Sequence, residues 1–259
     1  MESPKEILIA GQAAASPEDR LIVALDFPSA NEALALVERL EGVCRWFKVG
    51  LELYYAAGNG LTDTLRSKGF EVFLDLKLHD IPNTVAGGVR SVGGIGASLL
   101  TVHAGGGRAM LEAAAEAARA PGAPRLLAVT VLTSMDAGEL TGVGVTASPA
   151  EQVLRLARLA RAAGIDGMVC SAEEVGAVRS ALGDEVLLVT PGIRSADDAV
   201  DDQRRVVTPK GAIEAGSSML VVGRPITRAS DPAAAAQRIL EEIRLAAPLP
   251  PNFAQNLRK

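Results

Sequence analysis

The chain contains few aromatic, cysteine and histidine residues. Aromatic residues make up 3% of its 259 positions, and it has two cysteines and two histidines. Cys44 and Cys170 lie far apart, with no CxxC spacing and no accompanying histidine cluster, so the sequence indicates neither a disulfide framework nor a zinc site. We therefore expect two buried, reduced thiols and no bound metal.

Long apolar runs and an excess of positive charge are missing as well. No run approaches the roughly eighteen apolar residues needed to span a bilayer, and the first twenty residues lack the apolar core of a signal peptide. A formal net charge of −5 and a pI near 5.2 argue against general binding to nucleic acid or to anionic membranes. The sequence thus predicts a cytoplasmic protein without nucleic-acid or membrane partners, and leaves room for a local basic pocket that binds a small anion.

Hydrophobic residues, at 48% of the chain, must form an aliphatic core because aromatics are so scarce. Eight short aliphatic runs recur along the chain, and segments of helical periodicity such as Ala30–Leu40, Arg108–Ala120 and Ala150–Ala163 lie between them, with Ala233–Leu245 last. The eight candidate strands are Leu21–Leu25, Trp46–Val49, Val72–Leu76, Leu99–Val102, Leu126–Val131, Gly167–Cys170, Val186–Thr190 and Met219–Val222.

Most strand starts are separated by about 25 to 30 residues, which is the length of one βα unit, and no Pro- or Ser-rich linker interrupts the series. This alternation predicts an α/β fold, a single (β/α)₈ TIM barrel spanning residues 1–259. Within it we expect a short lead-in at Met1–Asp19 and a frayed tail at Pro248–Lys259. The active sites of such barrels lie at the C-terminal ends of the strands and in the loops that follow.

The ten residues from Asp75 to Thr84, DLKLHDIPNT, place two carboxylates and a lysine directly after an apolar run. Residues two apart on an extended strand share a face, so Asp75 and Lys77 should project the same way, with Asp80 following in a turn. Most charge clusters are solvated salt bridges on a surface, and a lone DxK would be read in that way. Its place at the end of a barrel strand favours a catalytic interpretation instead.

Lys48 lies in the run WFKVG of the second predicted strand. A lysine within an apolar strand is costly to desolvate without an acidic partner, and Asp75 on the neighbouring strand can supply one. Lys48, Asp75, Lys77 and Asp80 would then form a row of alternating charges with an ammonium available as a proton donor. Such a site suits the stabilisation of a carbanion.

Other polar residues follow the predicted strands at the same end. Asp26 ends the first strand, Thr133 follows the fifth, and Gly223 and Arg224 follow the eighth. Barrels commonly bind a phosphate after the last two strands, where backbone N–H groups and a guanidinium fork match the dianion. We therefore expect a phosphorylated substrate.

The segment from Pro191 to Thr208 is polar, charged and long for a βα connection. This length is typical of a lid that closes over a bound ligand, although a plain surface loop has the same composition. Arg194 and Gln203 are its expected contacts with phosphate or base. We assign no catalytic role to His79 or His103, because a single histidine is more often a structural hydrogen-bonding residue.

Taken together, these motifs are similar to those of the orotidine 5′-phosphate decarboxylase family, in its bacterial form. The resemblance runs from about Leu21 to Leu245. It implies loss of carbon dioxide from orotidine 5′-phosphate to give uridine 5′-phosphate (UMP), the last step of de novo UMP synthesis, without metal or organic cofactor. Besides DLKLHDIPNT, the resemblance rests on ALD at Ala24–Asp26, FKVG at Phe47–Gly50, LTS at Leu132–Ser134, TPGIR at Thr190–Arg194, DQRR at Asp202–Arg205 and GRPI at Gly223–Ile226.

The resemblance also implies a role for each site residue. Asp75 would lie against the substrate carboxylate, and Lys77 would protonate the ring carbon that loses it. The family is a homodimer with shared active sites, so Asp80 and Thr84 are expected to reach into the site of the partner subunit. The implied substrate contacts are Asp26 and Lys48 to the ribose hydroxyls, Thr133 to the pyrimidine, Gln203 between base and phosphate, Gly223 and Arg224 to the phosphate, and Arg194 from the lid.

Two other hypotheses keep the barrel and change what it does. Related D-x-K barrels decarboxylate sugar acids or perform aldol chemistry, commonly with a metal, so metal dependence would distinguish them from the decarboxylase. A non-catalytic barrel that binds a phosphorylated ligand is the third hypothesis. The intact set of Asp75, Lys77 and Asp80 argues against it.

Overall fold

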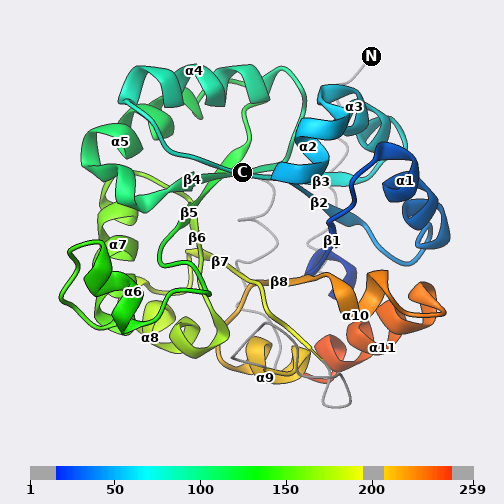
Figure 1. Ribbon diagram of the computed structural model, residues 1–259. Helices are drawn as coiled ribbons and strands as arrows, with labels where there is room; N and C mark the ends of the chain where they lie inside the picture. The colour runs from blue at the N-terminus through cyan, green and yellow to red at the C-terminus, as the bar shows by residue number, and fades with distance from the viewer. Residues whose placement is uncertain (1–15, 195–206, 247–259) are drawn as a thin grey trace.

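Eight parallel strands close into one barrel in chain order, with β8 pairing back onto β1, and this confirms the (β/α)₈ prediction. The computed structural model describes residues 16–194 and 207–246. Figure 1 looks down the ring of strands and shows the helices arranged around its outside. The interpretation of residues 1–259 as a single domain stays a prediction, because much of the lead-in and the whole tail lie outside the described residues.

The observed strands match the predicted runs to within a few residues. The largest differences are at β3, which extends through the charged motif to Leu78 instead of ending at Leu76, and at β5, which ends at Val129 instead of Val131. The strands are β1 (Leu21–Leu25), β2 (Trp46–Gly50), β3 (Glu71–Leu78), β4 (Leu99–His103), β5 (Arg125–Val129), β6 (Gly167–Val169), β7 (Leu187–Thr190) and β8 (Met219–Val222).

Helices connect the strands and cover the barrel on the outside. Several begin at a side-chain cap; Ser148, for example, accepts from the backbone N–H of Glu151 and forms a capping box with it. The helices are α1 (Ala30–Arg39), α2 (Leu51–Ala57), α3 (Asn59–Ser67), α4 (Pro82–Gly93), α5 (Gly107–Ala117), α6 (Ala137–Gly142), α7 (Pro149–Ala162), α8 (Ala172–Leu182), α9 (Pro209–Glu214), α10 (Arg224–Thr227) and α11 (Pro232–Arg244), with short 3₁₀ turns η1 (Pro17–Asp19) and η2 (Ala104–Gly106).

The core has two layers, one between strands and helices and one inside the barrel. The inner layer includes Trp46, Phe73, Leu99 and Leu127, all at most 5% exposed. Successive side chains of a strand point to opposite faces, so the residue two positions further along each strand also points inward. The alternation therefore stacks a second inner layer on this apolar one, nearer the C-terminal ends of the strands, and the functional side chains occupy that layer.

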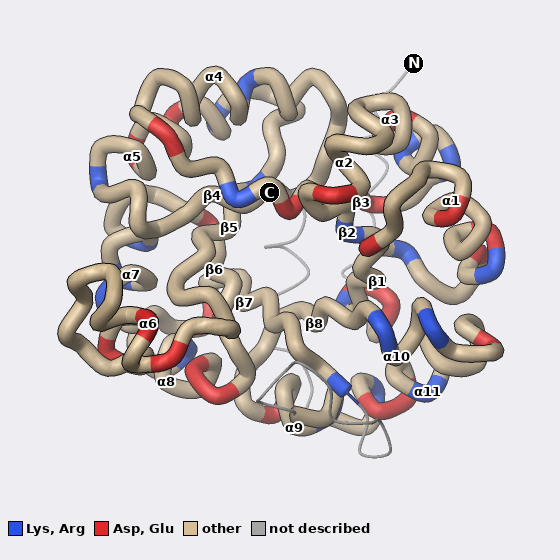
Figure 2. The backbone as a smooth tube through the Cα atoms, in the orientation of Figure 1, with Lys and Arg blue, Asp and Glu red and all other residues tan. Residues whose placement is uncertain are grey.

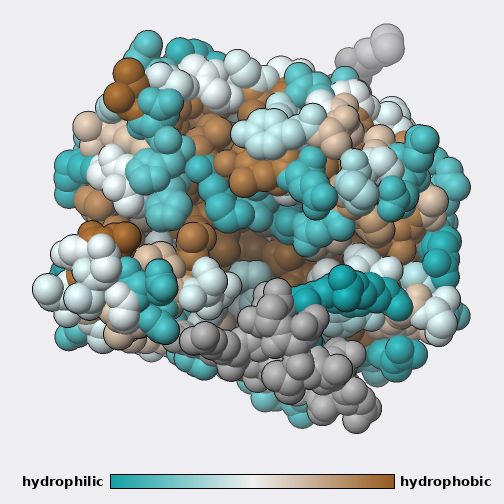
Figure 3. Space-filling model, in the orientation of Figure 1, coloured by the Kyte–Doolittle hydropathy of each residue, from teal (hydrophilic) through white to brown (hydrophobic). Residues whose placement is uncertain are grey.

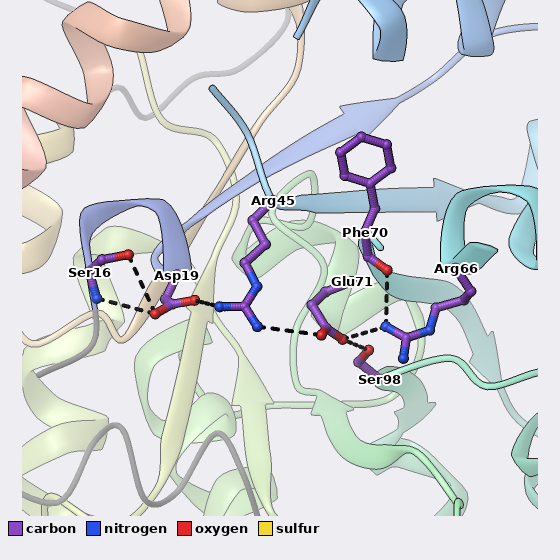
Figure 4. Close-up of polar contacts among 7 residues, drawn as sticks. All are labelled: Ser16, Asp19, Arg45, Arg66, Phe70, Glu71 and Ser98. Atoms are coloured by element: carbon purple, nitrogen blue, oxygen red, sulfur yellow. Dashed lines mark hydrogen bonds and ion pairs between the residues drawn. The ribbon is translucent and has the colours of Figure 1, made fainter. Parts of the chain in front are cut away.

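A network of charged residues lies at the N-terminal ends of the strands, and Figure 4 shows its contacts. Arg45 contacts Asp19 at 2.7 Å and Glu71 at 3.7 Å, while Arg66 contacts Glu71 at 2.7 Å. The Ser98 hydroxyl donates to the same Glu71 carboxylate. Because this network joins the N-terminal ends of β2, β3 and β4, we assign it to stability and not to catalysis.

The remaining charges lie mostly on the outer helices (Figure 2). None of the helices in the described ranges 16–194 and 207–246 combines the length and the apolar character needed to cross a membrane.

Candidate active site

A pocket of about 280 Å³ opens at the C-terminal ends of the strands. Its floor is aliphatic and aromatic, and its rim is charged. Figure 3 shows the molecule hollowed at the middle of this face, with hydrophobic residues in the hollow and hydrophilic ones around it. The floor includes Ala24, Phe73, Val129, Val169 and Val221, and the charged lining residues are Asp26, Lys48, Asp75, Lys77, Arg194 and Arg224.

Lys48 is the buried centre of an ion-pair chain. Its side chain is 10% exposed, and its Nζ lies 3.0 Å from Asp26 Oδ1 and 3.7 Å from Asp75 Oδ2. The strand register explains both contacts, because Ala24 pairs with Lys48 and Gly50 pairs with Asp75 across neighbouring strands. The predicted ion pair between Lys48 and Asp75 is therefore confirmed, and Asp26 adds a second carboxylate to the same ammonium.

Asp75 joins this lysine to the next one. Its Oδ1 lies 2.9 Å from Lys77 Nζ, and the two side chains are 17% and 33% exposed. The expectation that both point to the same side is confirmed. An ordinary extended strand does not produce the arrangement, however: the pairing of β3 with β4 shifts between Leu74 and Leu78, and Lys77 has a φ of +49°. A bulge thus turns Lys77 back toward Asp75.

Asp80 and Thr84 stand apart from this chain of charges. Both are exposed and neither lines the pocket. The Asp80 carboxylate accepts a hydrogen bond of 2.6 Å from the backbone N–H of Ile81, just before α4. Within one chain, the four alternating charges are therefore Asp26, Lys48, Asp75 and Lys77, and three ion pairs connect them.

The predicted ligand contacts gather around the same pocket. Thr133, Gly223 and Arg224 line it, and so does Arg194, whose side chain is buried. The two ends of the predicted lid meet, because Ile193 bridges Val207 and the Arg194 N–H donates to the Val207 carbonyl at 3.3 Å. Gln203 lies outside the described residues.

The sequence reasoning missed two residues that shape the site. The Thr101 hydroxyl contacts both Asp75 and the backbone of Lys77. A Cβ on Gly50 would lie 3.1 Å from Lys48 Nζ, which is a tight contact, so glycine leaves room for the buried ammonium. The sequence signal for Thr101 was a threonine in an otherwise aliphatic strand, two residues before His103.

The contacts of the two histidines fit a structural role. Their rings stack with centroids 5.0 Å apart, and His103 Nδ1 accepts a hydrogen bond from the Gly105 N–H at 3.2 Å. Burial, followed by the nearby His79 and Lys77, lowers the pKa of His103 and favours the neutral ring that this bond requires. Neither histidine lines the pocket.

Both cysteines should resist alkylation in the folded protein. Burial raises the pKa of the Cys44 and Cys170 thiols to about 12, with smaller contributions from Glu18 and Glu174. At pH 8 their thiolate fraction should be roughly a thousandfold lower than after unfolding. We expect iodoacetamide to leave native protein unmodified and to label both cysteines in urea, as read by mass spectrometry. Rapid labelling of the native protein would contradict this.

The arrangement is suited to chemistry that develops negative charge on a small ligand. Two ammonium groups held by carboxylates are preorganised over an apolar floor, and such fixed charges act strongly where water is excluded. Among the residues that the structure describes, no three His, Cys, Asp or Glu side chains are grouped as a metal ion would require. Fold and site together are those of a (β/α)₈-barrel enzyme with a charged pocket at the C-terminal ends of its strands.

Comparison with known proteins identifies the family. The chain belongs to the orotidine 5′-phosphate decarboxylase / HUMPS family, whose sequence profile matches residues 19–239. Orotidine 5′-phosphate decarboxylase from Halorhodospira halophila is 56% identical over 226 residues, covering 86% of this chain and 95% of that protein. The enzyme of the same name from Chromobacterium violaceum is 54% identical over 225 residues, covering 86% and 91%.

Solved structures agree with this assignment. The crystal structure of orotidine 5′-phosphate decarboxylase from Lactobacillus acidophilus matches with a TM-score of 0.78 and 42% identity, over 87% of this chain and 99% of that one. The enzyme from Pyrococcus horikoshii OT3 matches with a TM-score of 0.71 and 26% identity, over 86% and 99%. The resemblance read from the motifs is confirmed.

Proposed function

We propose that the protein decarboxylates orotidine 5′-phosphate to UMP and carbon dioxide, the last step of de novo UMP synthesis. The observation that carries this proposal is the ion-pair chain from Asp26 through Lys48 and Asp75 to Lys77 over an apolar pocket floor. Membership of the family and identities of 54% and 56% to proteins of that name support it. The expected cytoplasmic location belongs to the same proposal.

Lys77 is the proposed proton donor. When the bond between the ring carbon and the carboxylate breaks, carbon dioxide leaves and the electron pair stays on the ring carbon. The ammonium beside it stabilises this charge and then delivers a proton to that carbon. Asp75 faces the substrate carboxylate in this scheme, and its contact of 2.9 Å holds Lys77 in place. The chemistry is proposed to need no metal and no organic cofactor.

The other lining residues would bind the parts of the substrate that do not react. Gly223 and Arg224 are proposed to hold the phosphate, Asp26 and Lys48 the ribose hydroxyls, and Thr133 the pyrimidine. Arg194 and Gln203 would add contacts from the segment between Pro191 and Thr208. Binding energy gained at the phosphate, away from the bond that breaks, can close the site and exclude water.

We also propose a homodimer with shared active sites, in which Asp80 and Thr84 serve the partner's pocket. The exposure of both residues, outside the pocket of their own chain, fits this role. Mixing and reassociating the two inactive variants Lys77→Ala and Asp80→Ala should then restore activity. Random pairing makes half of the dimers mixed, each with one intact site, so activity should reach about a quarter of wild type.

The matched control is a mixture of Lys77→Ala with Asp75→Ala. Both residues act in the pocket of their own chain, so no intact site can form and no activity should return. An equal recovery in both mixtures, or a fully active monomer in sedimentation, would refute the shared sites.

The proposed reaction is tested by identifying its products. Chelator-treated protein incubated with orotidine 5′-phosphate should release UMP and carbon dioxide in equal amounts, measured by chromatography and by trapped carbonate. Activity that appeared only after a divalent metal was returned would favour the metal-dependent decarboxylases or aldolases of the superfamily. Tight UMP binding without any turnover would favour a ligand-binding barrel.

A further inference from the structure

Thr101 is a fully buried hydroxyl at the edge of the reaction pocket. It lies on β4, its relative exposure is 0%, and it follows the inward-facing Leu99 by two residues. The strand alternation therefore points it into the same inner layer as Lys48 and Asp75. It does not line the pocket surface, so it acts behind the groups that meet the ligand.

The hydroxyl joins two parts of the charged motif. It accepts a hydrogen bond of 2.8 Å from the backbone N–H of Lys77 and donates one of 3.1 Å to Asp75 Oδ1. A hydroxyl can accept and donate at the same time, and an ionised carboxylate can only accept, so the direction of both bonds is fixed. The Asp75 oxygen that receives this bond is the one that also contacts Lys77 Nζ.

The backbone of Lys77 explains why this acceptor matters. Among the described residues, Lys77 is the one non-glycine with a positive φ, at +49°. Leu74 pairs with Leu100 and Leu78 pairs with Val102, so β3 advances four positions where β4 advances two. An N–H displaced from the strand ladder by such a bulge needs another buried acceptor, and Thr101 provides it.

We propose that Thr101 is a positioning residue that holds the bulge and thereby aims the Lys77 ammonium at the reacting carbon. This inference rests on the proposed decarboxylase function and deepens it. Thr101 acts through the orientation of Lys77 and Asp75 and touches no phosphate contact, so its loss should lower kcat and leave nucleotide binding nearly unchanged.

The test replaces Thr101 with valine, which has the same shape and no hydroxyl. We expect kcat for orotidine 5′-phosphate to fall about 30-fold, which corresponds to about 2 kcal/mol at 1.36 kcal/mol per tenfold. The dissociation constant of UMP, measured by calorimetry, should change less than about threefold. Thr101→Ser keeps both hydrogen bonds and should recover kcat to within about threefold of wild type.

Thr62 provides a matched control. It is also 0% exposed, it lies on α3 away from the pocket, and its hydroxyl has no hydrogen-bond partner within the described ranges. Thr62→Val makes the same chemical change in a buried position and should leave kcat unchanged. If Thr101→Val fails to fold, the kcat of Thr101→Ala is compared with that of Thr101→Ser, which again tests the loss of the hydroxyl.

The outcomes separate this inference from the proposed function. An active wild type with an equally active Thr101→Val would refute the positioning role alone. A serine variant as slow as the valine variant would refute it too, because the hydroxyl would then not be responsible. A wild type that leaves orotidine 5′-phosphate intact would refute the proposed function, and the inference with it.

Discussion

Replacing Lys77 with alanine is expected to abolish turnover while the nucleotide still binds. The substitution removes the proposed proton donor and one of the two ammonium groups of the ion-pair chain. General acid catalysis and fixed electrostatic stabilisation each contribute at least about a hundredfold, so kcat should fall by roughly ten-thousandfold or more. The proposed phosphate contacts after β8 are untouched, so the dissociation constant of UMP should stay within about threefold of wild type.

Steady-state kinetics on orotidine 5′-phosphate and calorimetry with UMP measure the two quantities separately. Lys68→Ala, an exposed lysine at the C-terminal end of α3, is the control for removing a lysine without touching the site. It should keep wild-type kinetics. Substantial residual turnover in Lys77→Ala would show that the proton comes from elsewhere.

Replacing Arg224 with alanine should mainly weaken substrate binding. Arg224 lines the pocket at the start of α10, where its guanidinium can meet a phosphate dianion with two parallel hydrogen bonds. Loss of such a pair should raise KM roughly a hundredfold, with a smaller change in kcat, because phosphate binding contributes to the ground state and the transition state alike.

Arg228→Ala is the matched control for this prediction. Arg228 follows Arg224 by four residues, is exposed and does not line the pocket. Its removal should leave KM unchanged and thereby correct for any general effect of net charge. An unchanged KM in Arg224→Ala would show that the phosphate binds elsewhere.

The barrel could be predicted from the sequence because its signals are local. Each aliphatic run and each helical segment is visible by itself, and their regular spacing then fixes the order of the strands. The pair of Lys48 and Asp75 could be predicted for a related reason. A lysine in an apolar strand needs an acid, and consecutive strands of such a barrel lie side by side.

The bulge in β3 could not be predicted in this way. From the sequence, Asp75 and Lys77 are expected to be neighbours on a regular strand, and the structure instead reaches that contact through a positive φ at Lys77 and a register shift against β4. This conformation is stabilised from β4 by Thr101, more than twenty residues away along the chain, so no local pattern in DLKLHDIPNT reveals it. The position of Asp80 outside the pocket has the same kind of cause, since it depends on where the chain turns into α4.

The most direct test of the central claim is the fall in orotidine 5′-phosphate absorbance with purified, chelator-treated protein, run beside Lys77→Ala prepared identically. We predict rapid loss of absorbance with the wild type and none above background with the variant. That result would establish together a decarboxylase that needs no metal and its dependence on Lys77. No loss with either protein, or loss at equal rates with both, would contradict the account.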